Sequence, residues 1–77
     1  MLKTLKDFTI GEHGKIKSVK AEGLLKRRMY DMGITPGATV TLRKVAPLGD
    51  PIEITVRCCE VTLRKSEAET VWVEVAE

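Results

Sequence analysis

Three side chains in this sequence could bind a transition metal: Cys58, Cys59 and His13. Thiolates and imidazoles are ligands that zinc and similar borderline ions accept. Adjacent residues of a strand point to opposite faces, so Cys58 and Cys59 are poorly placed to hold one ion together. We favour a simpler interpretation, in which one cysteine is buried, the other lies at a turn, and His13 is a solvated loop residue. His13 and Cys59 stay as candidate ligands for weak Fe²⁺ or Zn²⁺ binding, with no cofactor required.

A second candidate group is the basic run Lys26-Arg27-Arg28. It falls near the start of a predicted helix, where the helix dipole disfavours cations by roughly 0.3–1 kcal/mol at the surface. An acidic partner or anionic headgroups could offset this cost. Alternatively, Glu22–Lys26 and Arg27–Asp31 are spaced for ion pairs within the helix. We retain both interpretations, with Arg27 and Arg28 as candidate partner-binding residues.

The third candidate is the loop Pro47-Leu48-Gly49-Asp50-Pro51, which sets prolines on both sides of a leucine. An apolar side chain on a stiff loop loses little entropy on binding and so makes a good anchor. The alternative is a turn whose leucine folds back over the domain. The loop exceeds what a two-residue hairpin needs, so we predict that Pro47, Leu48, Gly49, Asp50 and Pro51 contact a partner.

No set of residues resembles a catalytic centre. The chain shows no paired nucleophile and base, no phosphate-binding glycine loop, and one histidine. A chain of 77 residues also buries only a modest fraction of its surface, roughly 60%, and can spare few core positions for a deep cleft. We therefore expect a binding protein and not an enzyme.

One predicted helix positions the basic run. Leu25, Met29 and Met32 are spaced at i, i+4 and i+7, which predicts a helix over about residues 24–32. Gly23 is the expected N-cap, and Gly33 is the expected left-handed residue after the last turn.

Apolar and polar residues alternate over most of the remaining chain, which is typical of half-buried strands. Apolar spacing near the N-terminus favours a short helical turn within residues 2–10, and Ser66-Glu67-Ala68-Glu69 fits a capping box and one further turn. Five short strands left open would expose bare edges, so we expect a mainly β fold: a small SH3-like five-stranded barrel with one α-helix. The predicted strands cover residues 15–19, 39–43, 52–57, 61–64 and 71–75.

The composition limits the kinds of partner that the chain is expected to bind. With 77 residues and no linker or repeat, residues 1–77 are expected to form a single domain. A net charge of +2 and an aromatic content of 4% argue against nucleic-acid binding. No apolar run suits a signal peptide or membrane insertion, and adjacent cysteines cannot staple a loop. These features favour a cytoplasmic protein.

Three stretches together resemble the FeoA family, the small cytosolic component of bacterial ferrous iron transport. They are residues 27–37 (RRMYDMGITPG), 46–52 (APLGDPI) and 63–68 (LRKSEA). The opening residues 5–16 are also similar to that family's start, so the resemblance covers nearly the whole chain. It implies an SH3-like domain that acts with FeoB, the membrane permease that carries a GTPase domain, and that has no catalytic activity of its own.

Two positions depart from the family pattern. Met29 and Met32 stand where leucines are usual, which conserves volume and costs little. Cys58 stands where the family has glycine, and a turn that needs positive φ would be strained by a cysteine.

The favoured function is therefore an accessory or regulatory role in ferrous iron uptake, through binding of the cytosolic part of FeoB. The alternative is a small cytosolic module that binds or senses a transition metal. Weak self-association into a homo-oligomer stays open.

Overall fold

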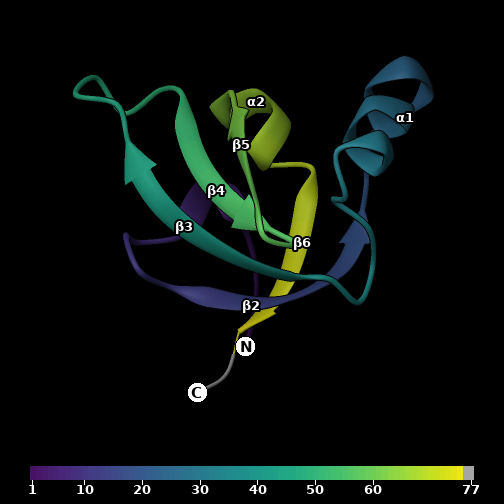
Figure 1. Ribbon diagram of the computed structural model, residues 1–77, viewed down its shortest axis with the longest axis horizontal. Helices are drawn as coiled ribbons and strands as arrows, with labels where there is room; N and C mark the ends of the chain where they lie inside the picture. The colour runs from purple at the N-terminus through teal and green to yellow at the C-terminus, as the bar shows by residue number, and fades with distance from the viewer. Residues whose placement is uncertain (76–77) are drawn as a thin grey trace.

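The computed structural model describes residues 1–75 of the chain (Figure 1). This part folds into a six-stranded sheet with a 3-10 turn η1 (Leu5–Asp7) and two helices, α1 (Gly23–Asp31) and α2 (Lys65–Ala68). Neither helix in this range has the length and apolar character needed to cross a bilayer. The strands are β1 (Leu2–Thr4), β2 (His13–Val19), β3 (Thr39–Val45), β4 (Ile52–Val56), β5 (Cys59–Leu63) and β6 (Val71–Val75).

The strands lie in the order β1-β6-β2-β3-β4-β5, and every neighbouring pair is antiparallel. The register shifts between Ile16 and Ser18 on β2 and between Leu42 and Lys44 on β3. Such bulges bend a strand and increase its twist, and Figure 1 shows β2 and β3 curving across the base of the molecule. Within residues 1–75 the ladder does not close between β1 and β5, so the expected barrel is partly open.

The predicted alternation is confirmed in the strands. Along β6, Val71 and Val73 are fully buried, whereas Trp72 between them is half-buried on the outer face. The same pattern runs along β4, whose Ile52, Ile54 and Val56 are buried. Inward-facing residues of this kind from β2 to β6 form one core, which is the main source of stability.

The N-terminal segment differs from the expected helical turn. Leu2–Thr4 pairs with β6, and only Leu5–Asp7 forms a 3-10 turn. Leu5 and Phe8 are buried but Leu2 is exposed, so the three apolar residues do not share one helical face. Pairing with β6 satisfies the backbone of this segment and adds a sixth strand to the five that we expected.

Helix α1 lies where the sequence predicts it, with one correction at its start. Glu22, not Gly23, is the N-cap, and no side chain caps the helix. Gly23 instead has a φ of +61°, a conformation that glycine adopts readily. Gly33 has the expected positive φ of +93°, and the Ile34 N–H then closes the helix by donating to the Met29 carbonyl at 2.9 Å.

Helix α2 also has a different cap from the one predicted. It begins at Lys65, and the Arg64 N–H just before it donates to the Glu67 carboxylate at 3.0 Å. The capping contact is therefore made by Glu67 and not by Ser66 with Glu69, because the N-cap is Arg64 and the helix starts two residues earlier than expected.

A two-residue turn joins β4 to β5. Val56 pairs with Cys59, and the residues between them have positive φ, +50° at Arg57 and +65° at Cys58. This is the type I′ conformation that matches the twist of a hairpin. The inference that Cys58 occupies a glycine-like position is therefore confirmed. Both cysteines are exposed, so the expectation that one is buried was wrong.

Candidate functional site

The loop between β3 and β4 is held rigidly by its own backbone. The Ala46 N–H donates to the Pro51 carbonyl at 3.0 Å, and the Gly49 N–H donates to the Ala46 carbonyl at 2.7 Å. Gly49 has a φ of +87°, which a side chain would strain. Leu48 at the tip is 96% exposed and does not fold back over the domain. The loop, which we call the proline loop (Ala46 to Pro51), thus presents an apolar side chain on a hydrogen-bonded support.

A second contact fixes the proline loop to α2. Asp50 Oδ1 accepts a hydrogen bond of 2.9 Å from the backbone N–H of Lys65. Lys65 also approaches the loop with its side chain, because a Cβ built on Gly49 would lie 3.1 Å from Lys65 Nζ. The position of the loop therefore depends on a helix far along the chain.

Helix α1 places its two arginines differently. Met29 is fully buried, and Leu25 and Met32 pack beside it, so these residues define the inner face. Successive helical residues are about 100° apart, which sets Arg28 at the border of this face and Arg27 on the outer side. Arg28 accordingly lines a pocket shared with the proline loop, and Arg27 does not line that pocket.

The ion pairs that could have neutralised the basic run do not form. Within residues 1–75, Glu22 makes no ion pair with Lys26, nor Arg27 with Asp31. Lys26 Nζ instead lies 5.8 Å from the centre of the Tyr30 ring, one turn along α1. The positive charges of α1 thus remain available to an acidic group from outside.

Two pockets meet at Pro51 and Thr62, and we call them together the two-part groove. The polar pocket has a volume of about 500 Å³ and lies between α1, the end of β5 and α2. The apolar pocket has a volume of about 310 Å³ and lies beside the proline loop. The polar pocket is lined by Arg28, Pro51, Thr62, Arg64, Ser66 and Glu67. The apolar pocket is lined by Val45, Ala46, Pro47 and Ile52, with Lys44 and Glu53 also in its lining.

Four residues of the polar pocket were not among the sequence-based site candidates: Thr62, Arg64, Ser66 and Glu67. A signal was present, because Thr62 and Arg64 alternate with the buried residues Val61 and Leu63 and must point outward. Alternation alone could not reveal that this outward face meets α1 and the proline loop.

The candidate metal ligands His13 and Cys59 do not come together. His13 is opposite Thr41 on β3, and β4 lies between β3 and the strand of Cys59. Three strand spacings place His13 roughly 14 Å from β5 along the sheet, too far for one ion. Within residues 1–75, no group of three or more His, Cys, Asp or Glu residues could hold a metal. Metal binding by either residue alone stays a prediction.

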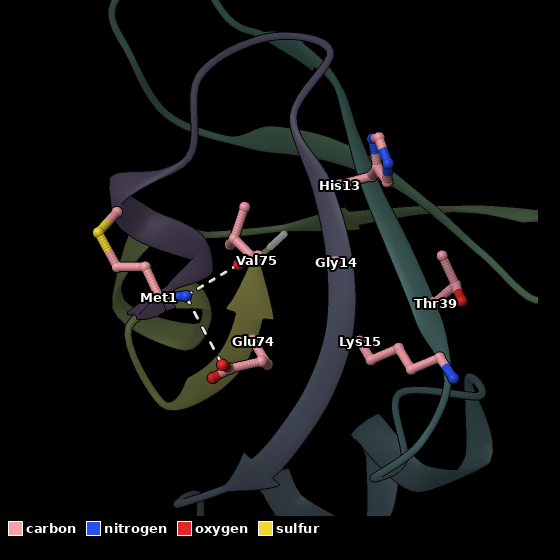
Figure 2. Close-up of a pocket in the computed structure, with 7 residues that line it drawn as sticks. All are labelled: Met1, His13, Gly14, Lys15, Thr39, Glu74 and Val75. Atoms are coloured by element: carbon pink, nitrogen blue, oxygen red, sulfur yellow. Dashed lines mark hydrogen bonds and ion pairs between the residues drawn. The ribbon is translucent and has the colours of Figure 1, made fainter. Parts of the chain in front are cut away.

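His13 lines a third pocket, of about 720 Å³, near the N-terminus. Figure 2 shows its ring on the β3 side of β2, with Glu74 and Met1 on the other side. The Met1 amino group donates to the Val75 carbonyl at 2.9 Å and lies 3.6 Å from Glu74 Oε1. Glu74, the acidic residue of this pocket, is thus paired away from His13.

A bent antiparallel sheet of short strands around one core is the architecture of a small SH3-like domain. The chain is similar to the FeoA of Stenotrophomonas maltophilia in complex with zinc, which is described as a prokaryotic SH3 domain protein. The two share 28% identity and a TM-score of 0.81, over 92% of this chain and 88% of that one. The model of the FeoA domain matches residues 3–75. The chain therefore belongs to the FeoA family.

The chain is also similar to two further proteins. The solution structure of the FeoA protein of Chlorobium tepidum is 35% identical and has a TM-score of 0.90, over 96% of this chain and 70% of that one. A fusion of Fe(2+) transport protein A with the Fe(2+) transporter FeoB, from Porphyromonas gingivalis, is 31% identical over 71 residues. The match covers 92% of this chain but only 8% of that relative.

Proposed function

We propose that this chain is a cytoplasmic accessory protein of ferrous iron uptake, without catalytic activity, that binds the cytosolic part of a FeoB permease. The observation that carries the proposal is the relative in which a matching segment is fused to FeoB in one chain. Fusion holds two modules at a high effective concentration, which favours even weak contacts between them. A separate chain of the same family would need a binding face to achieve the same contact.

The proline loop and α1 supply a suitable face. Leu48 is fully accessible on a loop whose shape is set by backbone hydrogen bonds and by Asp50. Preorganisation of this kind reduces the entropy lost on binding. Arg27 and Arg28, which form no ion pair within residues 1–75, add positive charge on α1. Charge of this kind increases association rates and selects acidic partners.

Regulation of the permease requires more than contact. A bound protein shifts a conformational equilibrium only if it binds two states with different affinity. We therefore propose that the chain distinguishes nucleotide-dependent states of the FeoB GTPase domain. This role needs no catalytic residue in the chain itself.

A direct affinity measurement tests the proposal. The full chain is titrated into the cytosolic domain of the FeoB from the same organism, loaded with GDP or with a non-hydrolysable GTP analogue. We expect saturable binding with different dissociation constants for the two states. Absence of binding to both states would contradict the proposed function, and equal affinity would contradict the regulatory mechanism while leaving the docking in place.

A further inference from the structure

The polar pocket is lined mainly by side chains that donate hydrogen bonds, and its one carboxylate already accepts a hydrogen bond from the backbone. Arg28 and Arg64 contribute two guanidinium groups, and the Thr62 and Ser66 hydroxyls add further donors. Glu67 is the acidic residue in the lining, and one of its carboxylate oxygens accepts the Arg64 backbone N–H at 3.0 Å. The side chains that line the pocket therefore carry two positive charges and one negative charge.

These donors have no partners among the described residues 1–75. Within residues 1–75, neither Arg28 nor Arg64 forms an ion pair, and no side-chain hydrogen bond uses the hydroxyls of Thr62 or Ser66. Guanidinium groups bind carboxylates through paired, parallel hydrogen bonds. An acidic side chain is thus the complementary occupant of the polar pocket.

The apolar pocket directly adjoins the polar one, since Pro51 and Thr62 line both. A free inorganic anion would fill only the polar pocket and would leave the apolar pocket beside the proline loop in water. A peptide segment can fill both pockets with neighbouring side chains. The net charge of +2 is also too small to favour a nucleic-acid backbone.

We infer that the two-part groove binds one short segment of the FeoB cytosolic domain, with an Asp or Glu side chain between Arg28 and Arg64 and an apolar side chain in the apolar pocket. This inference rests on the proposed function and names the groups that recognise the partner. It adds Arg64 to the binding face and assigns Arg28 the main role on α1, because Arg27 lies outside the pocket.

Charge reversals test the polar pocket. The affinity of the full chain for the FeoB cytosolic domain is measured for Arg28→Glu, Arg64→Glu and Arg27→Glu, with Lys17→Glu as the matched control. Lys17 is exposed on β2 and lines neither pocket, yet its reversal changes the net charge equally. We expect a loss of about tenfold or more for Arg28→Glu and Arg64→Glu, a smaller loss for Arg27→Glu, and little change for Lys17→Glu. Thermal unfolding confirms that each variant is folded.

A reciprocal change identifies the acidic side chain. Single Asp→Lys and Glu→Lys changes on the surface of the FeoB domain are tested against Arg64→Glu, and one of them should restore at least part of the lost affinity. Ala46→Glu, which places a charge in the apolar pocket, should weaken binding even at high salt, where exposed charges are screened.

The outcomes separate the inference from the proposed function. Binding of the unaltered chain together with normal affinity of Arg28→Glu and Arg64→Glu would overturn the groove but keep the function. Equal losses for Arg27→Glu and Arg28→Glu would show that the partner senses only the general charge of α1. Saturable binding of inorganic phosphate in the polar pocket at micromolar concentration would identify an anion site instead. No binding of the unaltered chain would overturn both.

Discussion

Asp50 and Lys65 join two distant parts of the chain, because Asp50 Oδ1 accepts a 2.9 Å hydrogen bond from the Lys65 backbone N–H. Asp50 belongs to the proline loop, and Lys65 is the first residue of α2. Each side of this contact borders the two-part groove, through Pro51 on the loop and Ser66 on the helix. The hydrogen bond therefore links the two walls of the proposed binding site.

Removal of this contact should weaken stability and binding together. Asp50→Ala is expected to lower the free energy of unfolding by about 1 kcal/mol, since the N–H of Lys65 loses its protein acceptor. The affinity for FeoB should also fall, because the loop is less ordered before binding. Urea denaturation and titration check the two effects. Asp31→Ala, at an exposed position, is the control and should change stability by less than about 0.5 kcal/mol. Normal affinity of Asp50→Ala would contradict a role for loop order in binding.

Cys58 should be replaceable by glycine with a gain in stability. Its φ of +65° is costly for residues with a Cβ and free for glycine. Part of the gain is offset by the greater flexibility of glycine in the unfolded chain, so about 0.5–1 kcal/mol should remain. Cys59→Gly, one residue further in β5, should instead destabilise the protein, because glycine weakens a strand. Thermal unfolding of both variants decides the matter, and a lower melting temperature for Cys58→Gly would contradict the assigned turn.

Gly14 is needed for the close approach of β2 to β6. A Cβ at this position would lie 2.4 Å from the Glu74 carbonyl oxygen and 2.8 Å from Val73 Cγ1. Gly14→Ala should therefore destabilise the fold by about 1–3 kcal/mol or more, measured by denaturation. Gly37→Ala separates this steric effect from backbone strain. Gly37 has a φ of +92° but open space around it, and we expect a loss nearer 1 kcal/mol. Comparable losses for the two variants would argue against the close contact.

Glu12 should make the stability depend on acid pH. Its carboxylate pairs with Lys3 and accepts the Thr9 backbone N–H at 3.0 Å, and these contacts lower the pKa of Glu12 below its ordinary value. A lowered pKa in the folded state stabilises the protein above the pKa of the unfolded chain. That contribution is lost as the pH falls through the folded-state pKa.

The variant Glu12→Gln should accordingly be less stable than the parent at neutral pH, and the difference should narrow as the solution is acidified. Urea midpoints measured across acid pH test this, and a difference that does not vary with pH would contradict it. In a Lys3→Met background the effect of Glu12→Gln should shrink, because the main partner is already absent.

The sequence pattern was sufficient to predict a helix or strand where buried and exposed residues alternate regularly. The strand at residues 71–75 was predicted with its observed limits, since buried valines there alternate with Trp72 and Glu74. Helix α1 was equally clear, because Met29 and its neighbours follow a helical period and Gly33 ends the helix. The segment Leu2–Thr4 was not predicted as a strand, because its conformation depends on pairing with β6 and not on its own pattern.

The candidate site could be predicted only in part. The exposure of Leu48 follows from the composition of its loop and is confirmed. The proximity of Arg28 to Pro51 and Arg64 depends on how α1 packs against the sheet, and no local pattern encodes it. For His13 and Cys59 the residue types suggested metal binding, but the sequence could not show that the order of the strands keeps the two residues apart.

The most direct test of the account is a titration of isotope-labelled full chain with the FeoB cytosolic domain, followed by NMR. We expect shift changes at the backbone amides of Leu48, Gly49 and Asp50 and at the guanidinium signals of Arg28 and Arg64, with little change at Lys17. This result would place the partner on the two-part groove and the proline loop. A folded chain that shows no changes, or changes confined to the β2 surface around His13, would contradict the central claim.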